Sequence, residues 1–186
     1  MTLTSPEKAR VSPAVARLLE ARPLPVVLPM TLPLLTGHWV GVHDGDPRAL
    51  ALFKRHYSYR HRASGQLRGS PTFVGQGQKM VLLTGDCLAL FAWQFSTVPR
   101  NSGQMGVNCT VFRNEGPILS SLLIREAMEL AWQRWPNQRL FTYVLPRKVR
   151  SGLPGACFLA AGWHYVRANG HRVRSKAGHV ILEAVA

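Results

Sequence analysis

A short run of side chains suited to proton transfer lies in the first third of the chain. Positions 54–62 read Lys-Arg-His-Tyr-Ser-Tyr-Arg-His-Arg, which places His56 beside the hydroxyls of Tyr57 and Ser58. A histidine titrates near neutral pH, so it can accept or release a proton beside such hydroxyls. Aromatic rings among arginines also suit base stacking and phosphate contact. With Tyr143, the three side chains form a candidate catalytic set; a solvated basic helix end is the alternative.

A second candidate is a loop between an expected strand and an expected helix, with the pattern Arg113-x-x-Gly116-x-Ile118. The N-terminus of a helix offers free N–H groups to an anion, and glycine permits close backbone approach. Pro117 has no N–H and Glu115 is negative, so an ordinary corner is the alternative. The residues expected to bind a cofactor phosphate are Arg113, Asn114, Gly116, Ile118, Leu119 and Ser120.

The charge of the chain favours a polyanionic partner. Its 186 residues carry a formal net charge of +14, with a pI of about 11.0. No acidic residue occurs within 47–85 or within 139–182, so positive charge gathers in two segments. Such segregation is typical of DNA- or RNA-binding proteins, although evenly solvated charge is the alternative. The residues expected to contact nucleic acid are Arg55, Arg60, Arg62, Arg147, Lys148 and Arg150.

Cysteine and histidine spacing argues against a metal site. The three cysteines, Cys87, Cys109 and Cys157, form no Cys-x-x-Cys pair, and no histidine pair has the spacing of zinc ligands. We therefore expect no structural metal, and free thiols in a reducing cytoplasm. The apolar run 24–35 is short and broken by prolines, so we expect neither a membrane span nor an export signal.

The pattern of elements predicts a proline-rich arm over residues 1–36 and one domain over 37–186. Apolar periodicity predicts a helix from Leu119 to Trp135, and Asp46-Pro47 marks the start of another. The remaining predicted elements are a hairpin turning at 84–86, strands at 106–112 and 139–146, a short helix ending at Gly162, and a terminal hairpin. This order predicts an α/β (α+β) fold with helices packed on a mixed sheet.

The order of these parts resembles the core of the GNAT acyltransferase superfamily over roughly residues 79–186. The resemblance rests on the loop after the strand at 106–112, the long helix, the next strand and a short helix closing at Gly162-Trp163. It implies a central splayed sheet flanked by helices, and acetyl-CoA or a related acyl-CoA as donor. Ile118 and Pro117 depart from the family's phosphate loop. Phe158 stands where the family often places a tyrosine acid.

The His-Tyr-Ser segment is similar to one that precedes the acyltransferase-like core of Mom-like DNA-modification proteins of phages and mobile elements. This resemblance implies a GNAT-fold transferase that modifies a nucleic-acid base, with DNA or a nucleotide as substrate. Two alternatives stay open. One is an acetyl-CoA-dependent N-acetyltransferase of a small amine, and the other is a non-catalytic DNA-binding protein with a GNAT fold.

Overall fold

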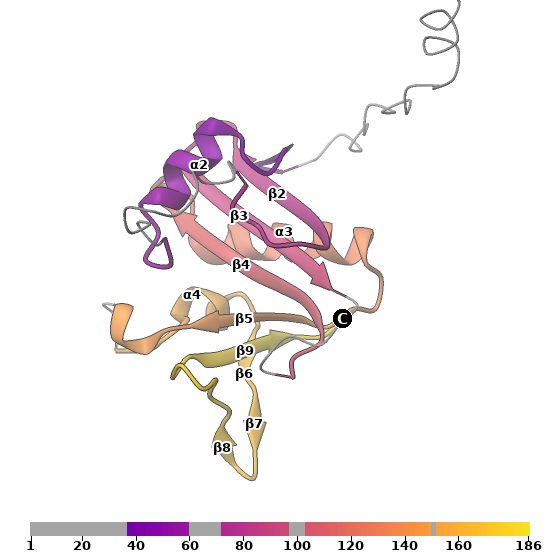
Figure 1. Ribbon diagram of the computed structural model, residues 1–186, viewed down its shortest axis with the longest axis vertical. Coiled ribbons are helices and arrows are strands. Elements are labelled where there is room, and N and C mark those ends of the chain that lie inside the picture. The colour runs from indigo at the N-terminus through magenta and orange to yellow at the C-terminus, as the bar shows by residue number, and fades with distance from the viewer. Residues whose placement is uncertain (1–36, 60–71, 97–102, 150–151) are drawn as a thin grey trace, which may run out of the picture. The chain divides into compact units, whose positions relative to one another are not determined.

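The computed structural model describes residues 37–59, 72–96, 103–149 and 152–186, all within one compact unit that spans 35–186 (Figure 1). The predicted proline-rich arm lies outside the described residues. The elements are β1 (Trp39–Val42), α2 (Pro47–Lys54), β2 (Gln78–Thr84), β3 (Ala89–Ser96), β4 (Gly106–Asn114), α3 (Ser120–Arg134), β5 (Leu140–Val144), the 3₁₀ turn η1 (Pro146–Lys148), α4 (Ala156–Ala160), β6 (His164–Tyr165), β7 (Arg167–Ala168), β8 (His171–Arg172) and β9 (Val180–Ala184).

A seven-stranded sheet in the order β1-β2-β3-β4-β5-β9-β6 forms the centre of this unit. All neighbouring strands are antiparallel except β4 and β5, which are parallel. The predicted mixed α/β class is therefore confirmed. The sequence reading omitted β1, whose four residues Trp-Val-Gly-Val are too few to show a strand period.

Helices α2 and α3 cover opposite faces of the antiparallel part of the sheet. Ala49 and Leu52 of α2 pack in a cluster with Val81 and Leu83, whereas α3 packs with Leu82 and its neighbours on the other face. This division follows from the alternation of side chains along β2. The predicted start of α2 is confirmed, because the Asp46 carboxylate accepts the main-chain N–H groups of the first turn.

Helix α3 was predicted at nearly its observed bounds, but its buried stripe was placed incorrectly at the N-terminal end. Leu119 and Leu122 are 67% and 37% exposed. Ile124 and Met128, which the prediction omitted, are buried in the core together with Leu123 and Ala127. The helix is thus rotated relative to the stripe predicted from leucine spacing, because contact with the sheet selects the face that is buried.

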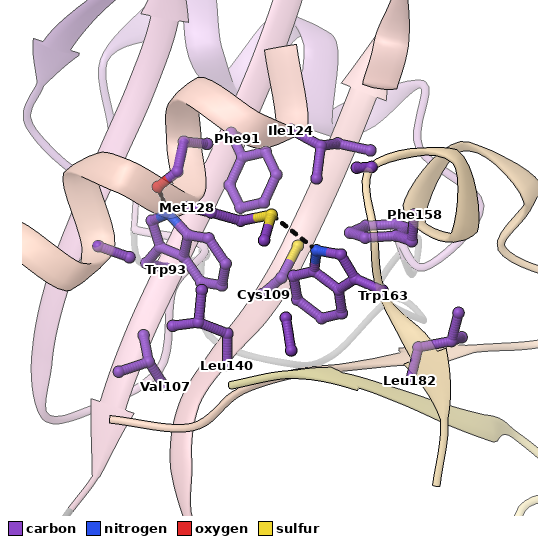
Figure 2. Packing of buried hydrophobic residues seen from close by; sticks show 14 of the residues in the cluster. Phe91, Trp93, Val107, Cys109, Ile124, Met128, Leu140, Phe158, Trp163 and Leu182 are labelled. Carbon is purple, nitrogen blue, oxygen red and sulfur yellow. Dashed lines mark hydrogen bonds between the residues drawn. The ribbon is translucent and has the colours of Figure 1, made fainter. Parts of the chain in front are cut away.

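Large aromatic side chains fill the core between α3, α4 and the sheet (Figure 2). The Trp163 indole stacks against Trp93, with ring centroids 6.3 Å apart, and meets Phe158 edge-on at 4.9 Å. Its Nε1 donates to the Met128 sulfur at 2.9 Å. These contacts tie α4 to α3 and to β3, so the short helix has a fixed place beside β5.

The C-terminal segment differs from the single hairpin that was predicted. Strand β9 lies between β5 and β6, and β7 and β8 form a separate two-stranded sheet. Val180 of β9 pairs with Val144 of β5, so the C-terminal segment completes the main sheet. The sequence showed two apolar strands around a turn but not which neighbour each would pair with.

Candidate functional site

The parallel strands β4 and β5 pair over only three residues. Val107 lies opposite Leu140, Asn108 opposite Phe141 and Cys109 opposite Thr142. At the closed end the Val107 amide donates to the Arg139 carbonyl at 2.8 Å. Beyond Cys109, β4 continues to Asn114 alongside β3 and β5 continues to Val144 alongside β9. The two strands therefore part at Cys109 and Thr142.

Two local features lie where the strands part. Thr110 has no partner in β3, since Ala92 pairs with Val111 and Trp93 with Cys109, so β4 carries a bulge there. The Thr142 hydroxyl donates to the Cys109 carbonyl at 3.0 Å, so the carbonyl of the last paired residue of β4 already accepts a side-chain hydrogen bond. A bulge bends a strand and increases its twist, which gives β4 a reason to turn away from β5.

A cavity of about 310 Å³ lies where β4 and β5 separate. That volume falls at the lower end of the range common for small-molecule pockets. Its lining combines apolar residues from β4, β5 and α4 with polar groups from the segment after α2. The lining residues are His56, Tyr57, Cys109, Thr110, Val111, Phe112, Thr142, Tyr143, Val144, Val149, Gly155, Ala156, Cys157 and Phe158.

His56, one of the predicted catalytic residues, lines this cavity just after the end of α2. Its Nδ1 lies 2.7 Å from the Ser58 hydroxyl and accepts the Ser58 main-chain N–H at 3.3 Å. Because an amide only donates, the neutral ring carries its proton on Nε2. Burial, with a smaller contribution from the positive charge of Arg113, lowers the pKa of His56 to about 4. The imidazole is therefore neutral at pH 7.

The structure brings the other predicted catalytic residues close to His56. The Tyr57 ring packs against the imidazole with centroids 4.4 Å apart, and its hydroxyl points to the Tyr143 carbonyl at 3.4 Å. Burial raises the pKa of Tyr57, so the phenol keeps its proton at neutral pH. Tyr143 also lines the cavity. Ser58 is exposed and reaches the site only through its contacts with His56.

The predicted phosphate loop does not line this cavity, and two of its main-chain amides are already hydrogen-bonded. The Glu115 N–H donates to the Leu88 carbonyl at 2.8 Å, and the Gly116 N–H donates to the Asn114 side chain at 2.9 Å. The Asn114 amide group in turn donates to the Ile118 carbonyl and the Ser120 hydroxyl. Asn114 therefore holds the loop together and, in this arrangement, the amide of Gly116 does not face an open anion site.

The first turn of α3 nevertheless has N–H groups to offer. The first residue of this helix is Ser120, and Leu119 is its N-cap residue. No side chain makes a capping hydrogen bond there. Within the described ranges the structure records no acceptor for the N–H groups of Leu119, Ser120 and Ser121. Leu119 and Ser120, both predicted to bind a cofactor, thus retain free donors beside the loop.

Arg113 and Arg55 converge on the carboxylate of Glu115. Arg55 donates to both Glu115 oxygens, at 2.8 and 2.6 Å, and Arg113 donates to one of them at 2.5 Å. Arg113 also donates to the Arg55 carbonyl at 2.6 Å, which ties the segment after α2 to the end of β4. The two guanidinium groups, Arg55 foremost, lower the pKa of Glu115 to about 2. The three ionised side chains together carry one net positive charge.

The two cysteines that line the cavity are protonated at neutral pH. Burial raises the pKa of both Cys109 and Cys157. A thiol reacts as its thiolate, so these side chains are expected to be poor nucleophiles in this structure. Among the described residues no group of three or more His, Cys, Asp or Glu side chains is placed to hold a metal ion.

The predicted nucleic-acid contacts are only partly placed by the structure. Arg147 and Lys148 are exposed on η1, directly after β5, whereas Arg55 is paired with Glu115. Arg60, Arg62 and Arg150 lie outside the described residues. No helix in the described part of the chain is long and apolar enough to cross a membrane.

Several cavity residues were not predicted from the sequence. Thr142, Val149, Cys157 and Phe158 were not among the predicted site residues, and they reach the cavity because η1 and α4 fold back beside β5. For Phe158 the resemblance predicted only the loss of a tyrosine acid, not a place in the wall of the cavity. The order strand, turn, short helix was the one signal that could have placed them together.

Comparison with known proteins adds no relative. No profile of a known protein family, no curated protein and no solved structure matches this chain.

Proposed function

We propose that this protein is a GNAT-type transferase that moves a group from an acyl-CoA-class donor to a base of a nucleic acid. The observation that carries the proposal is the early separation of β4 and β5 after three paired residues, with the cavity of about 310 Å³ between them. One parallel strand pair that opens in this way agrees with the splayed sheet implied by the resemblance to acyltransferases.

The residues around the cavity fit the acyl end and the amide-bearing arm of such a donor. Beyond Cys109 the facing edges of β4 and β5 do not pair with each other, and unpaired strand edges bind extended chains through main-chain hydrogen bonds. Val149, Phe112 and Phe158 supply an apolar wall that suits an alkyl or acyl group. When bound, the donor would supply an activated acyl carbon, a chemistry that the chain itself lacks.

The phosphate end of a donor has a place at the first turn of α3 in this proposal. Its free N–H groups and positive dipole end favour an anion, by about 0.3–1 kcal/mol at an exposed site. Arg113 stands at the end of β4 and would exchange part of its contact with Glu115 for a phosphate oxygen. Pro117 and the bonded amide of Gly116 leave this site with fewer donors than the resemblance implies.

His56 and Tyr57 carry the proton-transfer roles in this proposal. Acyl transfer to an amino group forms a C–N bond and breaks the donor's C–S bond, while the amine loses a proton and the departing sulfur gains one. The neutral His56 accepts the amine proton, and the protonated Tyr57 hydroxyl supplies the other. A base in duplex DNA would have to be flipped out to reach them, at a cost of a few kcal/mol.

One feature of the structure favours a second candidate, a DNA-binding protein of the same fold without catalysis. Arg113 is paired with Glu115, and the amides of Glu115 and Gly116 are already hydrogen-bonded, to Leu88 and Asn114. A loop so arranged functions as a corner without any ligand. This candidate shares the charge distribution of the first and differs in having no donor in the cavity.

Thermal unfolding with and without acetyl-CoA separates these candidates. At about a hundredfold excess over Kd, donor binding stabilises by about 2.7 kcal/mol and raises Tm by roughly 5 °C or more. Arg113→Ala and His56→Asn variants test the phosphate and proton-transfer roles. Loss of the shift in Arg113→Ala, with the shift retained in His56→Asn, is the expected pattern.

Mass analysis of nucleosides from expressing cells tests the acceptor. A new nucleoside that disappears in cells expressing His56→Asn supports base modification. A donor shift with an unchanged nucleoside profile, together with acetylation of small amines, indicates the N-acetyltransferase alternative. Duplex binding without any donor shift indicates the non-catalytic protein and overturns the transferase proposal.

A further inference from the structure

We propose that the β7–β8 hairpin is an arm that enters the major groove of duplex DNA. This inference rests on the part of the proposed function that gives the protein a nucleic-acid partner, and it does not depend on group transfer. The hairpin projects away from the main sheet (Figure 1). Its partner is defined by chemistry: a regularly spaced row of phosphates flanking a groove about 12 Å wide, which admits a two-stranded ribbon.

The hairpin is built as a ribbon of its own. Arg167 pairs with Arg172 and Ala168 with His171, and all four residues are exposed. Asn169 and Gly170 form the two-residue turn with φ of 49° and 78°, the positive values that a tight hairpin turn of this type requires. The ribbon buries little apolar surface, and two strands alone are marginally stable in water. Core packing therefore gives no account of why the chain extends so far.

The charges on one face of the ribbon are the main reason to infer an anionic partner. Arg167 and Arg172 lie directly opposite each other, and Arg174 is two residues further along the same strand direction. Like charges directly opposite each other destabilise a strand pair. Among the described residues no carboxylate forms an ion pair with any of the three. A phosphate placed between them would remove that repulsion.

Two contacts hold these guanidinium groups in place while leaving donors available. The Arg172 guanidinium lies over the Tyr165 ring, 3.9 Å from its centroid. Arg167 donates one N–H to the Gly170 carbonyl at 3.0 Å. A guanidinium has five N–H donors, so both side chains keep several for phosphate oxygens or base edges. Preorganised arginines lose less conformational entropy on binding than free ones.

The hairpin leaves the sheet at the same end as the cavity. Arg174 forms a β-bridge with Val180, which pairs with Val144, the last residue of β5 and part of the cavity lining. Arg147 and Lys148 follow β5 at that end. A duplex held by the arm is therefore anchored beside the cavity mouth, with η1 as a second phosphate contact.

The tip chemistry favours DNA over a lipid surface. The tip consists of Ala168, Asn169, Gly170 and His171, and it includes no large apolar side chain and no Phe, Tyr or Trp that would enter a bilayer. Interfacial membrane binding depends on such side chains as well as on charge. We therefore expect the arm to bind duplex DNA more tightly than vesicles of anionic lipid, and the test below includes both.

The test compares charge-matched variants of the full chain in fluorescence anisotropy with a labelled duplex. Arg167→Gln/Arg172→Gln removes two charges from the arm, and Arg125→Gln/Arg134→Gln removes two from exposed positions on α3. Each phosphate contact contributes about 0.9 to the slope of log affinity against log salt concentration, which is roughly 8-fold in affinity for each tenfold change in salt. The arm variant loses two arginines, so we expect its slope to be smaller than that of the wild-type protein by up to about 1.8. We expect the α3 variant to have the slope of the wild-type protein.

A second measurement locates the arm on DNA without removing charge. A photo-crosslinking residue is placed at the exposed Ala168 of β7, with the exposed Gln133 of α3 as the control position. We expect crosslinks to duplex from Ala168 and none from Gln133. An equal loss of affinity in both charge variants, or no crosslink from Ala168, overturns the arm.

The remaining outcomes separate the arm from the proposed function. Wild-type duplex binding that survives the arm variant overturns the arm alone. No duplex binding by the wild-type protein overturns both the arm and the nucleic-acid part of the proposed function. Tighter arm-dependent binding to vesicles of anionic lipid than to duplex also overturns the DNA assignment.

Discussion

Replacing His56 by asparagine is expected to make the protein more resistant to mild acid. Asparagine keeps a side-chain acceptor near the position of Nδ1, so the contact with the Ser58 N–H can persist while the titratable ring is removed. The pKa of His56 is about 4 in the folded protein, against an ordinary value of 6.5. Between these two pH values His56 binds a proton in the unfolded chain but not in the folded protein. The free energy of unfolding therefore decreases as pH falls from 6.5 towards 4.

The size of this effect follows from the two pKa values. Between pH 7 and pH 5 the linkage relation gives a loss of about 2 kcal/mol in the free energy of unfolding from this one histidine. The carboxyl groups of Asp46 and Glu115, with pKa values of about 2, lose their stabilising effect mainly below pH 5. They are present in both proteins, so their contribution cancels in the comparison.

Urea unfolding at pH 7 and pH 5, followed by tryptophan fluorescence, measures the effect. We expect His56→Asn to lose about 2 kcal/mol less than the wild-type protein over this interval. His171→Asn, which removes an exposed histidine from the hairpin, is the control and should behave as wild type. Equal losses in wild type and His56→Asn would show that burial and Arg113 do not lower the pKa of His56, and the reasoning from the buried imidazole would be refuted.

Substitutions at three further positions, with their controls, test the paired end of β4, the core and the loop before α3. Gly106→Ala is expected to destabilise by more than about 2 kcal/mol in urea unfolding, because the residue has φ of 114° and a Cβ would lie 2.3 Å from the Arg139 carbonyl oxygen. Gly85→Ala, with open space around it, is the neutral control. Trp163→Ala should cost about 3–5 kcal/mol and Trp163→Phe less, by the same assay; a loss below 1 kcal/mol, roughly that of a surface change, would contradict the packing in the core. Glu115→Gln frees its two arginine partners and should tighten acetyl-CoA binding in calorimetry; unchanged affinity would remove Arg113 from the donor site.

Local patterns were enough to predict most of the helices and strands. The Asp46-Pro47 start of α2 and the hairpin between β2 and β3 were confirmed, because a cap and a turn depend on neighbouring residues. The predicted stripe of α3 was partly wrong, since Leu119 and Leu122 are exposed. Which face of a helix is buried depends on the surface that it packs against.

The candidate site was predicted in part. His56, Tyr57 and Tyr143 were chosen for their chemistry, and the structure places all three around one cavity although the tyrosines are 86 residues apart in the chain. The loop at Gly116 was chosen for its position before a helix, and its amide is instead occupied by Asn114. A residue type indicates what a side chain can do, but not which neighbour has already satisfied it.

The sequence alone determined most of the helices and strands of this protein and the separation of its charges, because these depend on residue type and on spacing along the chain. Only the tertiary structure decided that β4 and β5 pair for three residues and then part. It also decided that Glu115 pairs with both Arg55 and Arg113 and that the hairpin projects beside the cavity. Strand register, burial and ion pairing join residues distant in sequence, and no local pattern encodes the partner of each.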